Sequence, residues 1–168
     1  MEIAGEISKD IFRSAMSSWA TGVSVITGSV TDGSAKPIGI VCNSLASISL
    51  EEKLILWSVD KSSSSYSHWI TAKSFNVHFL AEDQKDLVAR FAKKGADKFE
   101  GLDFETTELG NPILVGASVQ MECATTQTFD THDHMLIIGK VQTLVNSGKP
   151  PLLFLHSSLR SISELKTN

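Results

Sequence analysis

Residues 23–30 read Val-Ser-Val-Ile-Thr-Gly-Ser-Val, and residues 37–41 read Pro-Ile-Gly-Ile-Val. Both stretches are rich in β-branched residues, and the first alternates between apolar and polar side chains as a strand does. Residues 31–34, Thr-Asp-Gly-Ser, lie between them and form a strong turn signal. The two stretches therefore predict a β-hairpin near the start of the chain.

Further strands and a few helices follow from the same kind of pattern. Strands are expected at residues 54–59, 75–80, 119–129, 135–145 and 152–155, and helices at 11–19, 62–72 and 83–94. Ser8 is a plausible N-cap of the first helix, whose apolar face suits the core or a subunit contact. The apolar run 54–59 predicts burial on both faces, 95–112 predicts a long loop, and 152–155 is expected to be the last strand. Many strands with few β-α-β alternations predict a mainly β fold with α decoration, a closed or nearly closed barrel.

Composition limits the class of protein. The chain has 168 residues, 42% of them hydrophobic and 20% charged, which is typical of one globular domain. Its net charge of −4 argues against nucleic acid or an anionic membrane as partner. No apolar run is long enough to span a bilayer, and the acidic start lacks the features of a signal peptide. Together with Cys42 and Cys123, expected to be reduced thiols, this predicts a cytoplasmic protein.

Two polar stretches predict ligand contacts. Residues 41–49, Val-Cys-Asn-Ser-Leu-Ala-Ser-Ile-Ser, offer hydroxyls and an amide but no charge, which suits a flat ring with a polar edge. Residues 60–66, Asp-Lys-Ser-Ser-Ser-Ser-Tyr, add a cation and four hydroxyls before a helix. This second stretch suits a phosphate group, although serines that simply cap the helix are an alternative. Cys42 is more typical of a buried apolar residue than of a site residue.

Other chemistries find little support. The chain has no Gly-x-Gly-x-x-Gly after a strand, no P-loop and no Gly-x-Ser-x-Gly. His132 and His134 resemble a metal pair, but their spacing identifies no further ligand, so no metal site is predicted. His78 is expected to be structural, and His68 is expected on the exposed side of a short helix.

Read in order, the motifs resemble the flavin reductase family, split-barrel proteins that deliver reduced flavin to a separate monooxygenase. The matching stretches are Phe12-Arg13, residues 19–23, 43–50, 60–66, 75–77, 90–92 and 97–99 with Gly101, Asp133-His134 before 136–141, and residues 151–154. Each stretch is short, but their order is that of the family over about residues 10–158.

The resemblance implies roles for individual residues. Contacts along the isoalloxazine ring fall to Ala20, Thr21, Gly22, Val23, Asn43 and Ser44. The ring edge and ribityl chain fall to Ser47, Ile48 and Ser49, and the flavin phosphate to Lys61, Ser62 and Ser65. Phe91, Ala92 and Lys98 are expected to approach from a helix and a loop, across a dimer interface in one arrangement. His134 is implied as the catalytic residue beside the nicotinamide.

The resemblance also implies a fold and an activity. The fold is a homodimeric FMN-binding split β-barrel formed by one domain, residues 1–168. The activity is that of an NAD(P)H:flavin oxidoreductase, which uses NADH or NADPH to reduce FMN or FAD for a monooxygenase component. Alternatives are a non-catalytic protein that binds or stores flavin, and an enzyme that holds FMN tightly and acts on an organic substrate.

The chain departs from the family pattern at three places. Residues 51–53 are Glu-Glu-Lys where the family often has Asp-Pro-Pro, and Ser65 replaces a commoner threonine. Residues 157–160 are Ser-Ser-Leu-Arg where an Arg-Tyr pair often lies near the site. The departure at 157–160 removes a tyrosine that is expected to contact the ring.

Overall fold

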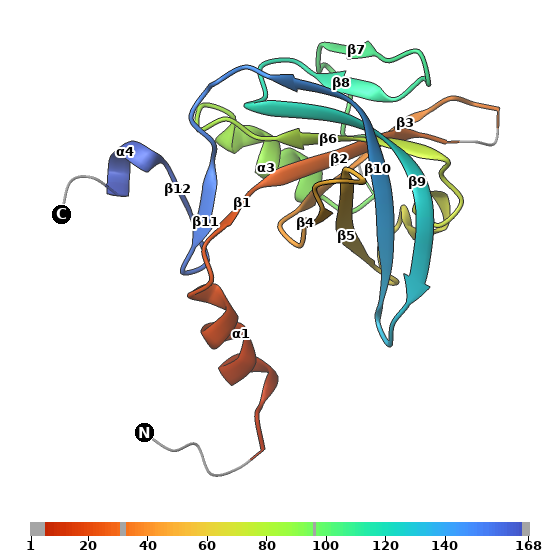
Figure 1. Ribbon diagram of the computed structural model, residues 1–168. Helices are drawn as coiled ribbons and strands as arrows, with labels where there is room; N and C mark the ends of the chain where they lie inside the picture. Colours follow the sequence, from red (N-terminus) through yellow and green to blue (C-terminus); the bar gives the residue numbers. More distant parts are fainter. Residues whose placement is uncertain (1–5, 31–32, 96, 166–168) are drawn as a thin grey trace.

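The computed structural model describes residues 6–30, 33–95 and 97–165, which form a mainly β structure with short helices (Figure 1). The strands are β1 (Thr21–Gly22), β2 (Ser24–Ser29), β3 (Pro37–Cys42), β4 (Ala46–Ser49), β5 (Leu54–Asp60), β6 (Ser74–Phe79), β7 (Phe104–Thr106), β8 (Pro112–Leu114), β9 (Val119–Asp130), β10 (His134–Asn146), β11 (Leu153–Leu155) and β12 (Ser158–Arg160). The helices are α1 (Lys9–Ser17), α2 (Tyr66–Trp69), α3 (Lys85–Ala92) and α4 (Ile162–Leu165).

Seven strands form one antiparallel sheet in the order β3-β2-β6-β9-β10-β5-β4, so β3 and β4 are its edges. β2 and β3 pair from Ser24 opposite Cys42 to Ser29 opposite Pro37, which confirms the predicted hairpin. Residues 31 and 32 of its turn lie outside the described residues. β9 and β10 form a long hairpin that crosses the sheet (Figure 1). A smaller sheet of β1, β11 and β12 lies beside the start of β2.

Two clusters of buried side chains form the core. Along β2, Val25 and Ile26 belong to different clusters, because neighbouring residues of a strand face opposite sides of the sheet. One cluster contains Trp57 and Trp69, whose rings meet edge to face with centroids 5.3 Å apart. The other contains Phe91 of α3, which packs against the opposite side. The sheet is therefore covered by α2 on one side and by α3 on the other.

The prediction that residues 54–59 are buried on both faces is wrong for one face. Ile55, Trp57 and Val59 are buried, whereas the residues between them in β5 are half-buried. A groove of about 530 Å³ lies at the start of β5 and is lined by both Leu54 and Ile55, so the half-buried face alone does not form it. An apolar strand face that its own chain leaves open is typical of a contact surface.

Two other expectations need correction. Residues 95–112 are not a continuous loop, because β7 lies within them and pairs with β8. The three residues of β7, Phe-Glu-Thr, are all exposed and too few to show an alternating pattern, so the sequence gave no strand signal. The strand at residues 152–155 is not the last, because the chain turns at His156 and Ser157 (φ 50° and 57°) into β12.

Helix α1 extends away from the sheet (Figure 1). Ser8 Oγ accepts a hydrogen bond from the Ile11 N–H at 3.3 Å, which confirms the predicted N-cap. Phe12 is 60% exposed and Trp19, just after the helix, is 71% exposed, so this apolar face is not part of the core. The His156 N–H donates to the Ser17 carbonyl at 2.7 Å and ties the helix to the β11–β12 turn. Among the described residues, no helix has the length and apolar character needed to cross a membrane.

His78 is fully buried in β6. Its Nε2 accepts the Leu114 N–H at 3.1 Å, and its Nδ1 lies 3.2 Å from the Val25 carbonyl. Because Nε2 is an acceptor, the ring proton is on Nδ1 and is donated to Val25. His78 therefore joins β6 to β2 and β8, as the structural role predicted for it requires.

We expect His78 to make stability depend on pH. Burial lowers the pKa of His78 from 6.5 to about 4. Below about pH 6.5 the unfolded chain binds this proton while the folded chain does not, so the free energy of unfolding decreases as the pH falls toward about 4. Urea unfolding should show a loss of about 3 kcal/mol across this window. The His78→Gln variant should be less stable at neutral pH and should lack this part of the pH dependence; an unchanged slope would contradict the assignment.

Candidate functional site

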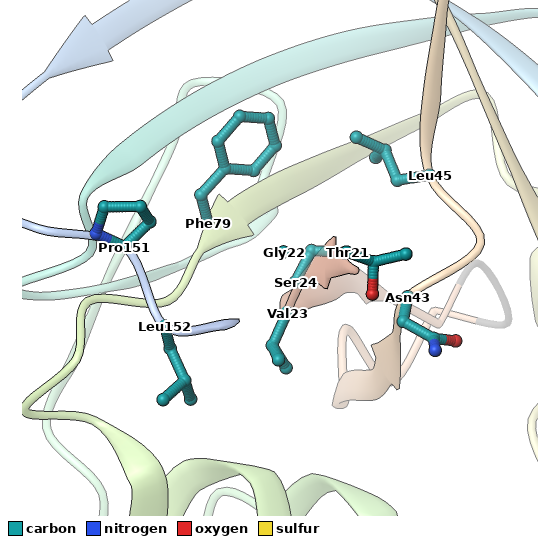
Figure 2. A pocket seen from close by; sticks show the side chains of 9 residues that line it. All are labelled: Thr21, Gly22, Val23, Ser24, Asn43, Leu45, Phe79, Pro151 and Leu152. Carbon is teal, nitrogen blue, oxygen red and sulfur yellow. The ribbon is translucent and has the colours of Figure 1, made fainter. Parts of the chain in front are cut away.

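A small pocket of about 160 Å³ lies where β1 runs into β2, beside the end of β3 (Figure 2). It is lined by Thr21, Gly22, Val23, Ser24, Asn43, Leu45, Phe79, Pro151 and Leu152. Pairing of β1 with β11 fixes Thr21 and Gly22, and Ser24 Oγ donates to the Cys42 carbonyl at 2.7 Å. The structure thus brings Thr21, Gly22, Val23 and Asn43 together, as expected for ring contacts.

Two polar groups at the small pocket have no partner within the described residues. Thr21 Oγ1 is buried without a hydrogen bond, and the exposed side chain of Asn43 makes none either. A buried polar group without a partner costs about 1–3 kcal/mol, which a bound ligand can recover. The pocket therefore offers an uncharged hydroxyl and an amide to a ligand with a polar edge, between the apolar walls of Val23, Leu45 and Phe79.

A wide cavity of about 570 Å³ adjoins the small pocket and shares Thr21, Asn43 and Leu45 with it. Its other lining residues are Arg13, Met16, Ser17, Trp19, Ser44, Ala46, Phe154 and Ser157. Ala20, also expected at the ring, is exposed in the link between α1 and β1. The departure at Ser157 thus lies at the site and leaves the wide cavity without a tyrosine at that wall.

Ser44 fixes the segment between β3 and β4. Its Oγ accepts hydrogen bonds from the Ser58 N–H at 3.1 Å and the Ser58 hydroxyl at 2.9 Å. The Cys42 Sγ lies 3.1 Å from the same oxygen, and Cys42 is only 7% exposed, as its predicted burial requires. Ser44 therefore anchors Asn43 to β5, where β4 no longer pairs with that strand.

A third cavity of about 220 Å³, which we call the anion cavity, lies at the opposite end of β3. Its lining combines residues from the β2–β3 hairpin, the serine stretch and the loop after α3: Val30, Lys36, Pro37, Ile38, Gly39, Ser64, Ser65, His68, Gly95, Asp97 and Lys98. Lys36 was not predicted, since no motif marks it and only the hairpin brings it here. His68 was expected to be exposed but is half-buried in this wall.

Lys98 is the best-positioned cation of the anion cavity. Its Nζ donates to the carbonyls of Gly39 and Phe91, both at 2.8 Å, which leaves one N–H of the ammonium group free. The side chain is half-buried with carbonyl partners and no carboxylate, and burial lowers the pKa of Lys98. A half-buried ammonium without a counterion favours the binding of an anion.

Lys61, expected at the phosphate, has a different arrangement. Its Nζ donates to Asp130 Oδ1 at 2.7 Å, the Thr131 carbonyl at 2.8 Å and the His132 carbonyl at 3.4 Å. The hydrogen bond to Asp130 raises the pKa of Lys61. Since an ammonium group has three N–H donors, the structure leaves none of them for a ligand.

The serines of the same stretch differ from one another. Ser65 Oγ accepts a hydrogen bond from Trp69 Nε1 at 2.9 Å and makes no capping bond to the backbone of α2, so the capping alternative is not what is found. Its hydroxyl also lies 3.2 Å from Ser63 Oγ, so its proton is donated either to that oxygen or into the anion cavity. Ser62 is exposed, and its N–H donates to Asp60 Oδ1 at 2.7 Å. Ser62 is not among the residues that line the anion cavity.

Phe91 and Ala92 lie at the end of α3. The Phe91 side chain is fully buried against Phe99, with ring centroids 5.3 Å apart, and so has no surface for a ligand. Its carbonyl instead positions Lys98. Ala92 is exposed.

The β4 residues lie apart from the small pocket. Ser47 and Ser49 line the groove beside β5 together with Leu50, which is 90% exposed, and Ile48 is 47% exposed. Ser49 Oγ accepts the Glu52 N–H at 3.1 Å. Within one chain Ser47 and Ser49 therefore face this groove and do not line the small pocket.

His134 opens β10 opposite Asp60 and lines none of the cavities described above. Its Nδ1 donates to Asp133 Oδ1 at 2.9 Å, and this hydrogen bond lowers the pKa of Asp133. The other ring nitrogen, Nε2, is left for a ligand, and the side chain is 38% exposed. Among the described residues no group of three or more histidine, cysteine or acidic side chains is arranged to hold a metal, and both cysteines are free.

Comparison with known proteins agrees with this geometry. Residues 16–163 match the flavin reductase like domain. The chain is 37% identical over 98% of its length to the flavin-dependent monooxygenase reductase subunit HsaB of Mycobacterium tuberculosis, of which it covers 88%. It is 39% identical over 89% of its length to the FMN reductase (NADH) SmoA of Agrobacterium fabrum, of which it covers 83%. The structure of the NADH:FAD oxidoreductase SgcE6 of Streptomyces globisporus, in complex with NAD and FAD fragments, superposes with a TM-score of 0.86 at 26% identity, covering 95% of this chain and 96% of that one. The chain therefore belongs to the flavin reductase like family.

Proposed function

We propose that this protein is an NAD(P)H:flavin oxidoreductase, which transfers a hydride from NADH or NADPH to FMN or FAD and supplies the reduced flavin to a separate monooxygenase component. Family membership and the names of the similar proteins support the reaction class. The observation that carries the proposal is the pair of sites at the two ends of β3. One site is uncharged and polar. The other has two lysines and one carboxylate, Asp97, and its Lys98 ammonium group bonds only to carbonyls.

The two ends of a flavin have the same division of chemistry. The ring has carbonyl and N–H groups along one edge and no charge in its oxidised form, whereas the ribityl chain ends in a phosphate. From Ile38 to Asn43 the backbone advances about 16 Å, a length suited to a ring and its ribityl phosphate. We place the ring at Thr21, Asn43 and Ser44, and the phosphate at Ser65 and Lys98.

The residues of the chain act here by position and polarity. When bound, the flavin supplies the hydride acceptor, so the protein needs no nucleophile. Thr21 Oγ1 and the Asn43 amide orient the polar edge of the ring, and Ser44 holds Asn43 in place through Ser58. The apolar walls of the small pocket exclude water from one side of the site, which strengthens these hydrogen bonds.

We also propose that residues 1–168 form one split β-barrel domain that works as a homodimer in the cytoplasm. The open edges of the sheet support the homodimer. β3 and β4 have no strand beyond them among the described residues. The groove beside β5 is lined by Leu45, Leu54 and Val141, and exposed Leu50 lies at its rim. A second copy on this face would cover it and would bring Ser47, Ile48 and Ser49 to the interface, where the resemblance expects flavin contacts.

We expect His134→Ala to raise the KM for NADH by about 10-fold with a smaller change in kcat, because the free Nε2 would hydrogen-bond the nicotinamide carboxamide. The affinity for oxidised flavin should not change. His132→Ala, which removes the exposed neighbouring imidazole, is the matched control and should behave like the native protein. Steady-state kinetics with varied NADH make the measurement; equal effects of the two substitutions would refute the assignment.

The decisive test of the proposed function is anaerobic stopped-flow mixing of the protein and flavin with NADH or NADPH, followed at the visible absorption band of oxidised flavin. Rapid and saturable bleaching with one pair is the expected result and identifies both cofactors. If flavin binds but bleaches no faster than without protein, the chain is a flavin-binding or storage protein and the proposal is wrong.

A further inference from the structure

The wide cavity is larger than orientation of a flavin ring requires. At about 570 Å³ it falls in the size range of ligand sites, and it is continuous with the small pocket through Thr21 and Asn43. Its outer wall is formed by α1 and by Trp19, two residues beyond the end of that helix, not by the sheet. A ligand that starts in the small pocket therefore has room to continue along α1.

Arg13 is the one charged residue among those that line the wide cavity. Its partner is Asp10 on the same helix, with Nη1 and Oδ1 2.9 Å apart, and their side chains are 75% and 88% exposed. An ion pair this exposed contributes little and is easily exchanged for another anion. Guanidinium groups bind phosphate oxygens in a bidentate manner, so the charge at this wall suits a pyrophosphate.

The neighbours of Arg13 suit a flat base. Trp19 lines the same cavity with its indole 71% exposed, and Met16 beside it is 50% exposed. An exposed aromatic ring is a stacking surface for a nucleobase whatever its identity. A cation beside such a ring is the combination that recognises an adenosine diphosphate group.

We infer that the wide cavity binds the adenosine diphosphate half of a dinucleotide, with Arg13 at the pyrophosphate and Trp19 against the adenine. This inference rests on the proposed function, because that function supplies NADH or NADPH, a dinucleotide that carries this group and whose nicotinamide must meet the flavin ring. The adenylate half of FAD continues from the flavin phosphate, which we place at the opposite end of β3. The reacting end of the dinucleotide lies toward Thr21 and Asn43. A mononucleotide such as FMN lacks the group and does not use Arg13.

Direct binding tests the inference without any redox step. ADP is titrated into flavin-free protein, by calorimetry and by tryptophan fluorescence. Trp57 and Trp69 are 0% and 1% exposed, so quenching by ADP reports on Trp19. We expect ADP to quench the emission, and Arg13→Gln to weaken ADP binding by about 10-fold. Lys9→Gln removes the same charge from the same helix outside the cavity and should leave ADP binding unchanged.

Two further comparisons identify the source of the group. If Arg13→Gln weakens FAD but not FMN, the adenylate half of FAD occupies the cavity, which would contradict the placement of the flavin phosphate at Lys98. If Arg13→Gln raises the KM for NADH but not for reduced nicotinamide mononucleotide, the adenylate half of the nicotinamide cofactor occupies the cavity. Only the second result supports the inference.

Other results overturn it. Failure of ADP to bind at millimolar concentration, with FAD affinity and the NADH KM unchanged in Arg13→Gln, refutes the inference while flavin reduction by the native protein keeps the proposed function. A changed oligomeric state of Arg13→Gln in size-exclusion chromatography would assign this face of α1 to a subunit contact and also refute it. ADP binding through Arg13 without flavin reduction would reject the proposed function alone.

Discussion

Lys98→Gln is expected to weaken the binding of FMN by about 30-fold and to leave the binding of riboflavin unchanged. Riboflavin has the same ring and ribityl chain but no phosphate, so the difference between the two ligands isolates the phosphate contact. The Lys98 ammonium uses two N–H groups on the carbonyls of Gly39 and Phe91 and keeps the third for the ligand. One hydrogen bond between charged groups at a half-buried position contributes about 2 kcal/mol, or about 30-fold in Kd. Calorimetric titration with oxidised FMN and with riboflavin makes the measurement.

Lys61→Gln is the matched control for this experiment. Lys61→Gln removes the same charge, from the lysine that the sequence pattern favours for the phosphate. In the native protein all three N–H donors of Lys61 are already bound within the chain. We expect Lys61→Gln to change the Kd for FMN by less than about 3-fold, because solvent and salt screen an exposed charge that does not contact the ligand. Equal losses of FMN affinity in Lys98→Gln and Lys61→Gln would contradict this assignment and would indicate that Lys61 also binds the phosphate. Equal losses of FMN and riboflavin in Lys98→Gln would mean that the substitution had disturbed the fold.

Gly39→Ala should lower the free energy of unfolding by about 2–3 kcal/mol, an effect of overpacking. A Cβ at this position would lie 2.4 and 2.7 Å from two ring atoms of Phe91. Phe91 is fully buried and stacked edge to face on Phe99, so its ring has little freedom to retreat. Because Gly39 and Phe91 also hold the Lys98 ammonium, the same substitution should weaken FMN binding. Urea unfolding and the FMN titration measure the two effects.

A second substitution tests the steric cause. In Phe91→Leu the smaller side chain leaves room for the added methyl group, so Gly39→Ala should cost clearly less in that background. The comparison is a double-mutant cycle, and its coupling free energy should be about 1 kcal/mol or more. Additive losses would show that the glycine is needed for another reason.

The sequence predicted the large strands well because their signals are local. Alternation and β-branched residues mark β2, β6, β9 and β10, and pairing in the sheet preserves those boundaries to within a few residues. The short strands β1, β4, β7, β8 and β12 were not predicted, since each has four residues or fewer and owes its pairing to a neighbouring strand. The burial of β5 was overestimated. An apolar strand face can be covered by the same chain or by a second chain, and a single sequence does not distinguish the two.

The candidate site was predicted in part for a similar reason. Asn43 and Ser44 stand out in an apolar context, and the structure places both at the wall of the wide cavity. The choice between Lys61 and Lys98 depends on which acceptors surround each ammonium group. Those acceptors come from distant segments, the β9–β10 turn for Lys61 and the strand β3 for Lys98. Adjacency to a serine stretch therefore favoured Lys61, while only the folded chain shows that its donors are occupied.

The two buried thiols bear on chemical durability. Free reduced flavin reacts with dioxygen to form hydrogen peroxide. A protein that releases reduced flavin is therefore exposed to peroxide. Peroxide attacks the thiolate, and susceptibility follows thiolate content and access. Burial raises the pKa of Cys123 to about 12, and Cys42 is only 7% exposed. The fold thus keeps its cysteines as packing residues that peroxide reaches poorly, and the protein should withstand many aerobic turnovers without losing thiols.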